Sequence, residues 1–285
     1  MEADINLSQE LFKSLNDFFS LIFSSIDNSL YTILDKIVFI NPDILSNSAF
    51  KQLIGSSSNE GIILICNSLV LGFIIYYAIN YLFSHLTYSP IESPKQFIFK
   101  AIIFISIMNS SLWICKEIIN IVYLINQAII TVGEKILIQE ISFSNFIENL
   151  NKLIFISDSS FNVISFDGII KSFSTFGLLN LIFTHSLRYI MIQIFILLSP
   201  FAFLSLITQR TSFFFNVWIK SFISLLLVQI LISLILVLSF TMSIKSNDLL
   251  SKILYIGITY ALLRANHFVR ELFGGISTDI SVGKF

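Results

Sequence analysis

Four polar residues lie close together inside a long apolar stretch of the chain. Asn180, Thr184 and Arg188 are spaced at i, i+4 and i+8, and His185 lies three residues before Arg188. Residues three or four positions apart are neighbours on a helix surface, so these side chains are predicted to share one face. A guanidinium group in lipid is costly, so Arg188 should face protein, water or headgroups. Either Arg188 anchors the helix at an interface, or this face lines a polar path or a seam between subunits.

Two glutamines occupy the two longest apolar runs. Gln193 lies in the first of them and Gln229 in the second. Side-chain amides can hydrogen-bond between helices in a bilayer, at roughly 0.6–2 kcal/mol each. We interpret both glutamines as contacts that hold neighbouring helices together.

The sequence offers little catalytic chemistry. It contains no phosphate-binding loop and no GxGxxG, HExxH or GxSxG motif, and His85, His185 and His267 are widely scattered. Cys66 and Cys115 are too far apart for a CxxC or zinc pattern and are expected to be small buried hydrophobes. We therefore predict no enzyme activity, with no catalytic residue, no metal site and no cofactor.

The composition is that of a membrane protein. Of 285 residues, 55% are hydrophobic and 12% are charged, and the mean hydropathy is +0.85. Soluble domains carry about 25% charged residues, so this chain has too little charge to cover a water-facing surface. The fold class predicted is all-α, a polytopic transmembrane protein with about five spans and additional amphipathic surface helices.

The five predicted spans differ in quality. The ranges are 61–83, 97–115, 176–207, 214–242 and 249–265. The third and fourth are long and form a hairpin, whereas Asn109 and its serine neighbours weaken the second. The fifth is short and is interrupted by Lys252, so it is either a span or a re-entrant helix. Pro200 inside the third span predicts a kink or break near Leu198.

The predicted organisation follows from these spans. The chain divides into an amphipathic N-terminal region at 1–57, two spans at 58–115, an amphipathic extramembrane region at 116–174, the long hairpin with the short final span at 175–265, and a C-terminal tail at 266–285. The tail contains Gly274 and Gly275, which predict the end of a helix.

The hairpin region resembles a known family. Leu-Leu-Ser-Pro-Phe-Ala-Phe at 197–203, which contains Ser199 and Pro200, is followed by a polar link, then by Trp218 and Lys220. This pattern is similar to the paired core helices of the TrbL-like polytopic subunits of conjugative type IV secretion systems. The resemblance covers residues 178–272 and extends loosely to the order of the parts.

The resemblance implies a function without catalysis. Such a subunit is a structural or channel part of the bacterial inner-membrane complex through which DNA or protein leaves the cell. Its expected partners are other secretion-system membrane subunits, the ATPases that supply energy, the lipid bilayer and copies of itself. The net charge of −1 and pI near 6.3 give no basic footprint, so tight direct binding of nucleic acid is not predicted.

Two other classes of function stay open on the sequence. One is a membrane subunit of a permease for a small solute, for which the face containing Asn180, Thr184 and Arg188 would be the candidate site. The other is a pore-forming or lysis protein.

Overall fold

The computed structural model describes residues 13–14, 17–18, 31–55, 61–88, 92–153, 166–242 and 249–274. Throughout these ranges the fold is all-α, as predicted. The α-helices are α2 Tyr31–Val38, α3 Ser48–Ile54, α4 Ile62–Thr87, α5 Pro94–Asn109, α6 Ser111–Leu137, α7 Phe143–Leu153, α8 Phe166–Leu204, α9 Ser212–Thr241 and α10 Leu249–Phe273, with short 3₁₀ turns η1 Pro42–Leu45 and η2 Ser205–Ile207.

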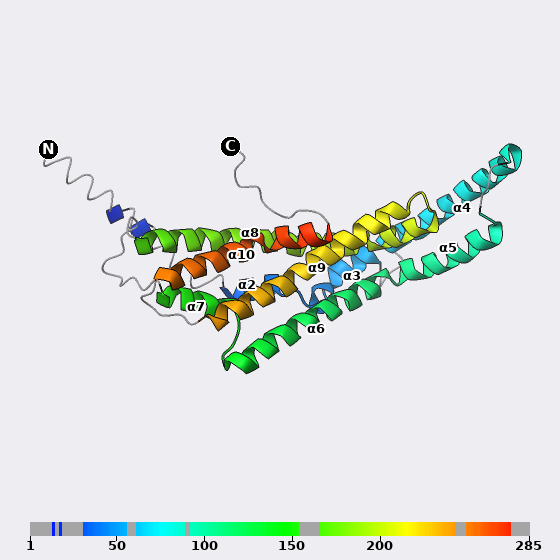
Figure 1. Ribbon diagram of the computed structural model, residues 1–285. Coiled ribbons are helices and arrows are strands. Elements are labelled where there is room, and N and C mark those ends of the chain that lie inside the picture. Colours follow the sequence, from blue (N-terminus) through cyan, green and yellow to red (C-terminus); the bar gives the residue numbers. More distant parts are fainter. Residues whose placement is uncertain are drawn as a thin grey trace.

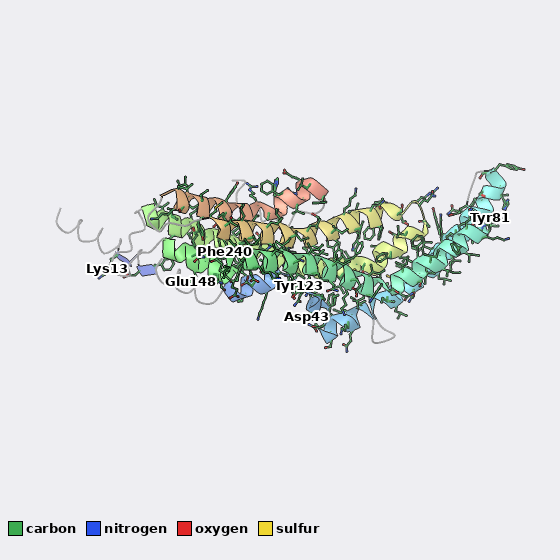
Figure 2. The ribbon with its side chains drawn as sticks, turned by 60° about the horizontal axis from the view of Figure 1, so that its bottom comes forward. Lys13, Asp43, Tyr81, Tyr123, Glu148 and Phe240 are labelled. Carbon is green, nitrogen blue, oxygen red and sulfur yellow. The ribbon has the colours of Figure 1, made fainter. Side chains whose placement is uncertain are left out.

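The helices form an elongated bundle (Figure 1). Helices α8 and α9 make an antiparallel hairpin along its length, and α10 packs against both of them. Helices α4 and α5 project beyond the α8–α9 turn at one end, where Figure 2 shows Tyr81, while α7 with Glu148 lies at the other end. The 39 residues of α8 alone give a length of about 58 Å at 1.5 Å per residue. This helix is therefore much longer than a bilayer core.

Four helices in the described part of the chain are long and apolar enough to cross a membrane. They are Ile62–Thr87, Ser111–Leu137, Gly168–Ile207 and Ser212–Thr241. The first, third and fourth correspond to predicted spans. The protein is thus a helical membrane protein, but its second and fifth predicted spans need correction.

The second predicted span, 97–115, is divided between two helices. The helix α5 ends at Asn109, whose side-chain amide donates to the carbonyl of Ile105 at 2.9 Å, and α6 begins at Ser111. Asparagine and serine compete for backbone hydrogen bonds, which favours a helix end at this point.

The candidate span that follows is α6, within the region predicted to be extramembrane. Its charges lie near its two ends, at Lys116, Glu117, Glu134 and Lys135, and the residues between these pairs are uncharged. The many charges elsewhere in 116–174 make that region polar on average, although the interval 118–133 carries none.

The fifth predicted span, 249–265, belongs to a longer helix that is not among the four helices long and apolar enough to cross a membrane. Helix α10 continues to Phe273 and includes charged Lys252, Arg264, Arg270 and Glu271. It is amphipathic, and its buried residues, among them Tyr255, Ile258 and Leu262, belong to one apolar cluster with residues of α7, α8 and α9. The helix ends as predicted, with Gly274 at a φ of 74° and its N–H bonded to the carbonyl of Arg270.

The first half of the predicted amphipathic N-terminal region, 1–57, lies mostly outside the described residues. Lys13, Ser14, Asp17 and Phe18, which are described, are helical. Residues 275–285 of the predicted tail also lie outside the described part.

Close helix packing explains one glycine in α6. A Cβ added to Gly133 would lie 2.6 Å from Cδ1 of Ile141 and 2.8 Å from a methyl of Val237 on α9. The absence of a side chain therefore lets α6 approach α9 closely.

Candidate functional site

Two of the predicted polar residues form hydrogen bonds to the same short segment of backbone. Arg188 of α8 is fully buried, and its Nη2 donates a hydrogen bond to the carbonyl of Val38 at the end of α2. Gln229 of α9 is 1% exposed, and its Oε1 accepts a hydrogen bond of 2.9 Å from the N–H of Ile40. One side chain of α8 and one of α9 thus bind the backbone of residues 38–40. We call Arg188, Gln229 and this segment the backbone clamp.

The rest of the predicted polar face is only partly assembled. Thr184 is 4% exposed and His185 is fully buried, so both accompany Arg188 in the interior. Asn180 and Gln193 are half-buried. Gln229, predicted to hold neighbouring elements together, bonds to the backbone N–H of Ile40 just beyond the end of α2.

The sequence reasoning missed two members of the polar interior. Asn126 of α6 is fully buried and its Oδ1 accepts a hydrogen bond from Oγ of Ser233 on α9, which also bonds to the carbonyl of Gln229 at 2.8 Å. Ser233 lies four residues after Gln229, so its place on the same helix face was readable from the spacing. Asn126 was overlooked because α6 was assigned outside the membrane.

This polar interior is rich in hydrogen-bond donors. Nδ2 of Asn126, Nε and Nη1 of Arg188 and Nε2 of Gln229 are buried and find no hydrogen-bond partner among the described residues. The same holds for both ring nitrogens of His185. Within that part of the chain Arg188 also forms no ion pair. The site can therefore bind acceptors such as water or a carbonyl group, and it carries positive charge where burial is expensive.

A carboxylate helps to position the clamped segment from outside the spans. Asp35 of α2 accepts a hydrogen bond of 3.0 Å at Oδ1 from the backbone N–H of Phe143, at the start of α7. Burial raises the pKa of the Asp35 carboxyl above its usual range, although the backbone hydrogen bonds from Phe143 and Ser144 act in the opposite direction. Helix α2 is thus fixed to α7 by Asp35 and to the α8–α9 hairpin by the backbone clamp.

Helix α8 is not broken at Pro200. Proline has no N–H to donate to the carbonyl four residues earlier, which is that of Ile196. Oγ of Ser199 donates to this carbonyl at 2.7 Å. The helix therefore continues through Pro200 to Leu204, and the break expected near Leu198 is absent.

Trp218 joins this part of α8 to α9. Its indole Nε1 donates to the carbonyl of Phe195 at 2.8 Å, and its ring is 2% exposed. The ring stacks on Phe222 at 5.3 Å between centroids and contacts Phe203 and Phe215. Of the four residues that carry the family resemblance, Trp218 joins α9 to α8, Ser199 and Pro200 are buried within α8, and Lys220 is exposed.

Ser199→Ala is expected to destabilise the protein by about 1–3 kcal/mol, because the buried carbonyl of Ile196 loses its donor. In a Pro200→Ala background a backbone N–H is available at this position, so the same change should cost less than ~0.5 kcal/mol. Reversible unfolding in detergent micelles measures both values.

Ser205 provides the matched control for this pair of substitutions. Its hydroxyl makes an equivalent 2.7 Å bond to the carbonyl of Ala202, beyond the proline. The cost of Ser205→Ala should be the same with and without Pro200. Equal costs for Ser199→Ala in the two backgrounds would contradict the assigned role of Ser199.

The fold and the polar interior together define an all-α polytopic membrane protein in which the antiparallel α8–α9 hairpin packs against α6 and α10. Comparison with known protein families, with curated proteins and with solved structures finds no match to the chain.

Proposed function

We propose that the protein is a structural or channel subunit of a conjugation-type (type IV) secretion apparatus, which moves DNA or protein across the inner membrane of a bacterium. The observation that carries this proposal is that Ser199 and Trp218 donate to the successive carbonyls of Ile196 and Phe195 on α8, about one turn before Pro200 and near the turn of the α8–α9 hairpin. Ser199, Pro200 and Trp218 are among the residues on which the resemblance to TrbL-like subunits rests. Their contacts give a physical reason for that pattern, because Ser199 and Trp218 bind successive carbonyls beside the proline.

The distribution of apolar surface also supports a subunit of a larger assembly. Only 11% of the most apolar stretch of α4 is buried within the chain, against 56% for α8 and for α9. On neighbouring α5, Ile98, Phe99 and Ile102 are each more than half exposed. This projecting pair of helices offers a large apolar surface to lipid and to the neighbouring subunits of the proposed apparatus.

The buried polar groups favour this structural role over a solute pathway. Arg188 and His185 are completely buried, and Arg188 and Gln229 bond to backbone rather than lining an open cavity. In the proposed role the protein carries no catalytic residues, and partner ATPases supply the energy.

Deleting the gene is expected to lower the transfer frequency of a mobile element, or the amount of secreted protein, by orders of magnitude while the growth rate stays unchanged. The reason is that a structural subunit matters only when the apparatus assembles. Transfer frequency measures the effect, with the wild-type gene supplied in trans as the control. Purification in mild detergent should also recover other secretion subunits.

Wild-type transfer in the deletion strain would overturn the proposal. Solute uptake by the purified protein alone in liposomes would favour the permease alternative, and toxicity of the protein made alone would favour a pore or lysis protein.

A further inference from the structure

A polar cavity lies where α4 passes the turn between α8 and α9. Its volume is about 680 Å³, and Asn80 and Tyr76 of α4 line it together with Thr208, Gln209 and Arg210 of the turn. Tyr76, Tyr77 and Tyr81 are in this part of α4, and tyrosine is enriched at the headgroup level of membranes. The cavity therefore lies at a place suited to a lipid headgroup.

Arg210 brings an available positive charge to this cavity. Its Nη1 donates to the neutral hydroxyl of Tyr76 at 2.9 Å, and it forms no ion pair with any residue that the structure describes. The carboxylate that lines the same cavity, Glu92, is already paired with Lys100. The guanidinium thus retains donors for an anionic group, and such charge-assisted bonds are about twice as strong as neutral ones.

The walls of the cavity are held in place independently of any ligand. The hydroxyl of Tyr77 donates to the backbone carbonyl of Glu92 at 2.6 Å, and its ring stacks on Phe97 at 3.8 Å between centroids. These contacts fix the projecting end of α4 to α5, so the cavity is formed before anything binds.

An apolar groove opens directly beside the charged cavity. It has a volume of about 280 Å³ and is lined by Leu69, Gly72 and Phe73 of α4. Tyr76, Thr208 and Arg210 line both spaces. A Cβ placed on Gly72 would meet no atom within 4 Å, so the groove is open at this residue.

We propose that this double site binds one anionic phospholipid. The phosphate lies against Arg210, Thr208 and Gln209, and an acyl chain lies in the groove over Gly72. A free phosphate would use only the charged half, whereas the continuous apolar groove along a candidate span matches a lipid tail. The inference is independent of the proposed secretion function.

Native mass spectrometry of the full chain, released from nanodiscs of phosphatidylcholine and phosphatidylglycerol, tests the site. Wild-type protein should retain phosphatidylglycerol in preference to phosphatidylcholine. Arg210→Gln should weaken retention of phosphatidylglycerol by about tenfold through loss of a charged contact, and Arg210→Lys should recover part of it. Gly72→Leu should reduce retention of both lipids, because the new side chain fills the groove.

The chain offers a matched control for each change. Arg264 is an exposed arginine that also donates to a tyrosine hydroxyl, that of Tyr260, at 3.1 Å. Gly257 is a second helical glycine with nothing within 4 Å of an added Cβ. Arg264→Gln and Gly257→Leu should both leave lipid retention at the wild-type level.

Three results would overturn the proposal. The first is unchanged phosphatidylglycerol retention in Arg210→Gln, and the second is an equal loss in the Arg264 or Gly257 control. The third is displacement of phosphatidylglycerol by excess inorganic phosphate, with Gly72→Leu having no effect, which would identify the occupant as a small anion. Only variants whose melting temperature equals that of the wild type are compared, so that misfolding is not mistaken for lost binding.

Discussion

Arg188→Leu is expected to lower transfer or secretion by at least about tenfold while leaving the protein as thermally stable as the wild type. Two contributions to the free energy of unfolding change in opposite directions in this variant. Losing the bond to the carbonyl of Val38 costs about 1–3 kcal/mol, whereas removing a buried charge that has no acidic partner in the described structure relieves a desolvation cost of similar or larger size. A costly buried arginine that can be removed without loss of stability indicates a role in the working protein.

The measurement combines three readouts on the same variant. Transfer frequency gives function, the melting temperature in detergent gives stability, and hydrogen–deuterium exchange of residues 31–40 reports the clamped segment. Exchange there should rise, because the segment has lost one of its two side-chain contacts.

Gln229→Leu is the matched variant for the other half of the backbone clamp. It leaves the N–H of Ile40 without its acceptor and removes no charge, so it should destabilise the protein by about 1–3 kcal/mol. Normal transfer with Arg188→Leu would show that the residue is dispensable. A fall in melting temperature as large as that of Gln229→Leu would show that its role is purely structural.

Trp218→Ala is expected to destabilise the protein by about 3–5 kcal/mol, because it leaves a cavity between α8 and α9 and removes the donor to the carbonyl of Phe195. Trp218→Phe keeps most of the ring packing and should lose only about 1 kcal/mol. Under the proposed function, the alanine variant should also abolish transfer, since the hairpin is the centre of the fold. Unfolding monitored by circular dichroism in micelles gives the stability of each variant.

Trp113, the only other tryptophan in the chain, serves as the control. Its side chain is 63% exposed on α6, and Trp113→Ala should change stability by less than ~0.5 kcal/mol. If Trp113→Ala and Trp218→Ala lower the free energy of unfolding by the same amount, the packing assigned to Trp218 is wrong.

The sequence alone determined the fold class and the central hairpin. Long uncharged apolar runs specify helices through local composition and length, so α4, α8 and α9 follow from the pattern of their own residues. The end of α10 also follows from a local residue, because Gly274 adopts the positive φ that glycine tolerates best. The polar face was predicted in part, since helical periodicity places Thr184 and Arg188 on the same side.

Only the tertiary structure decided which apolar helices become buried and what the polar residues contact. Helix α10 is amphipathic, so its residues are placed by packing against α8 and α9 rather than by their own hydropathy. Arg188 bonds to Val38, 150 residues earlier, and Gln229 to Ile40, 189 residues earlier. Contacts at such separations leave no periodic signal in a single sequence, because they depend on how α2 docks on the finished hairpin. The same reason explains Arg210: its spacing identifies a polar turn, but its position beside Tyr76 and the open surface of Gly72 exists only after α4 has packed against that turn.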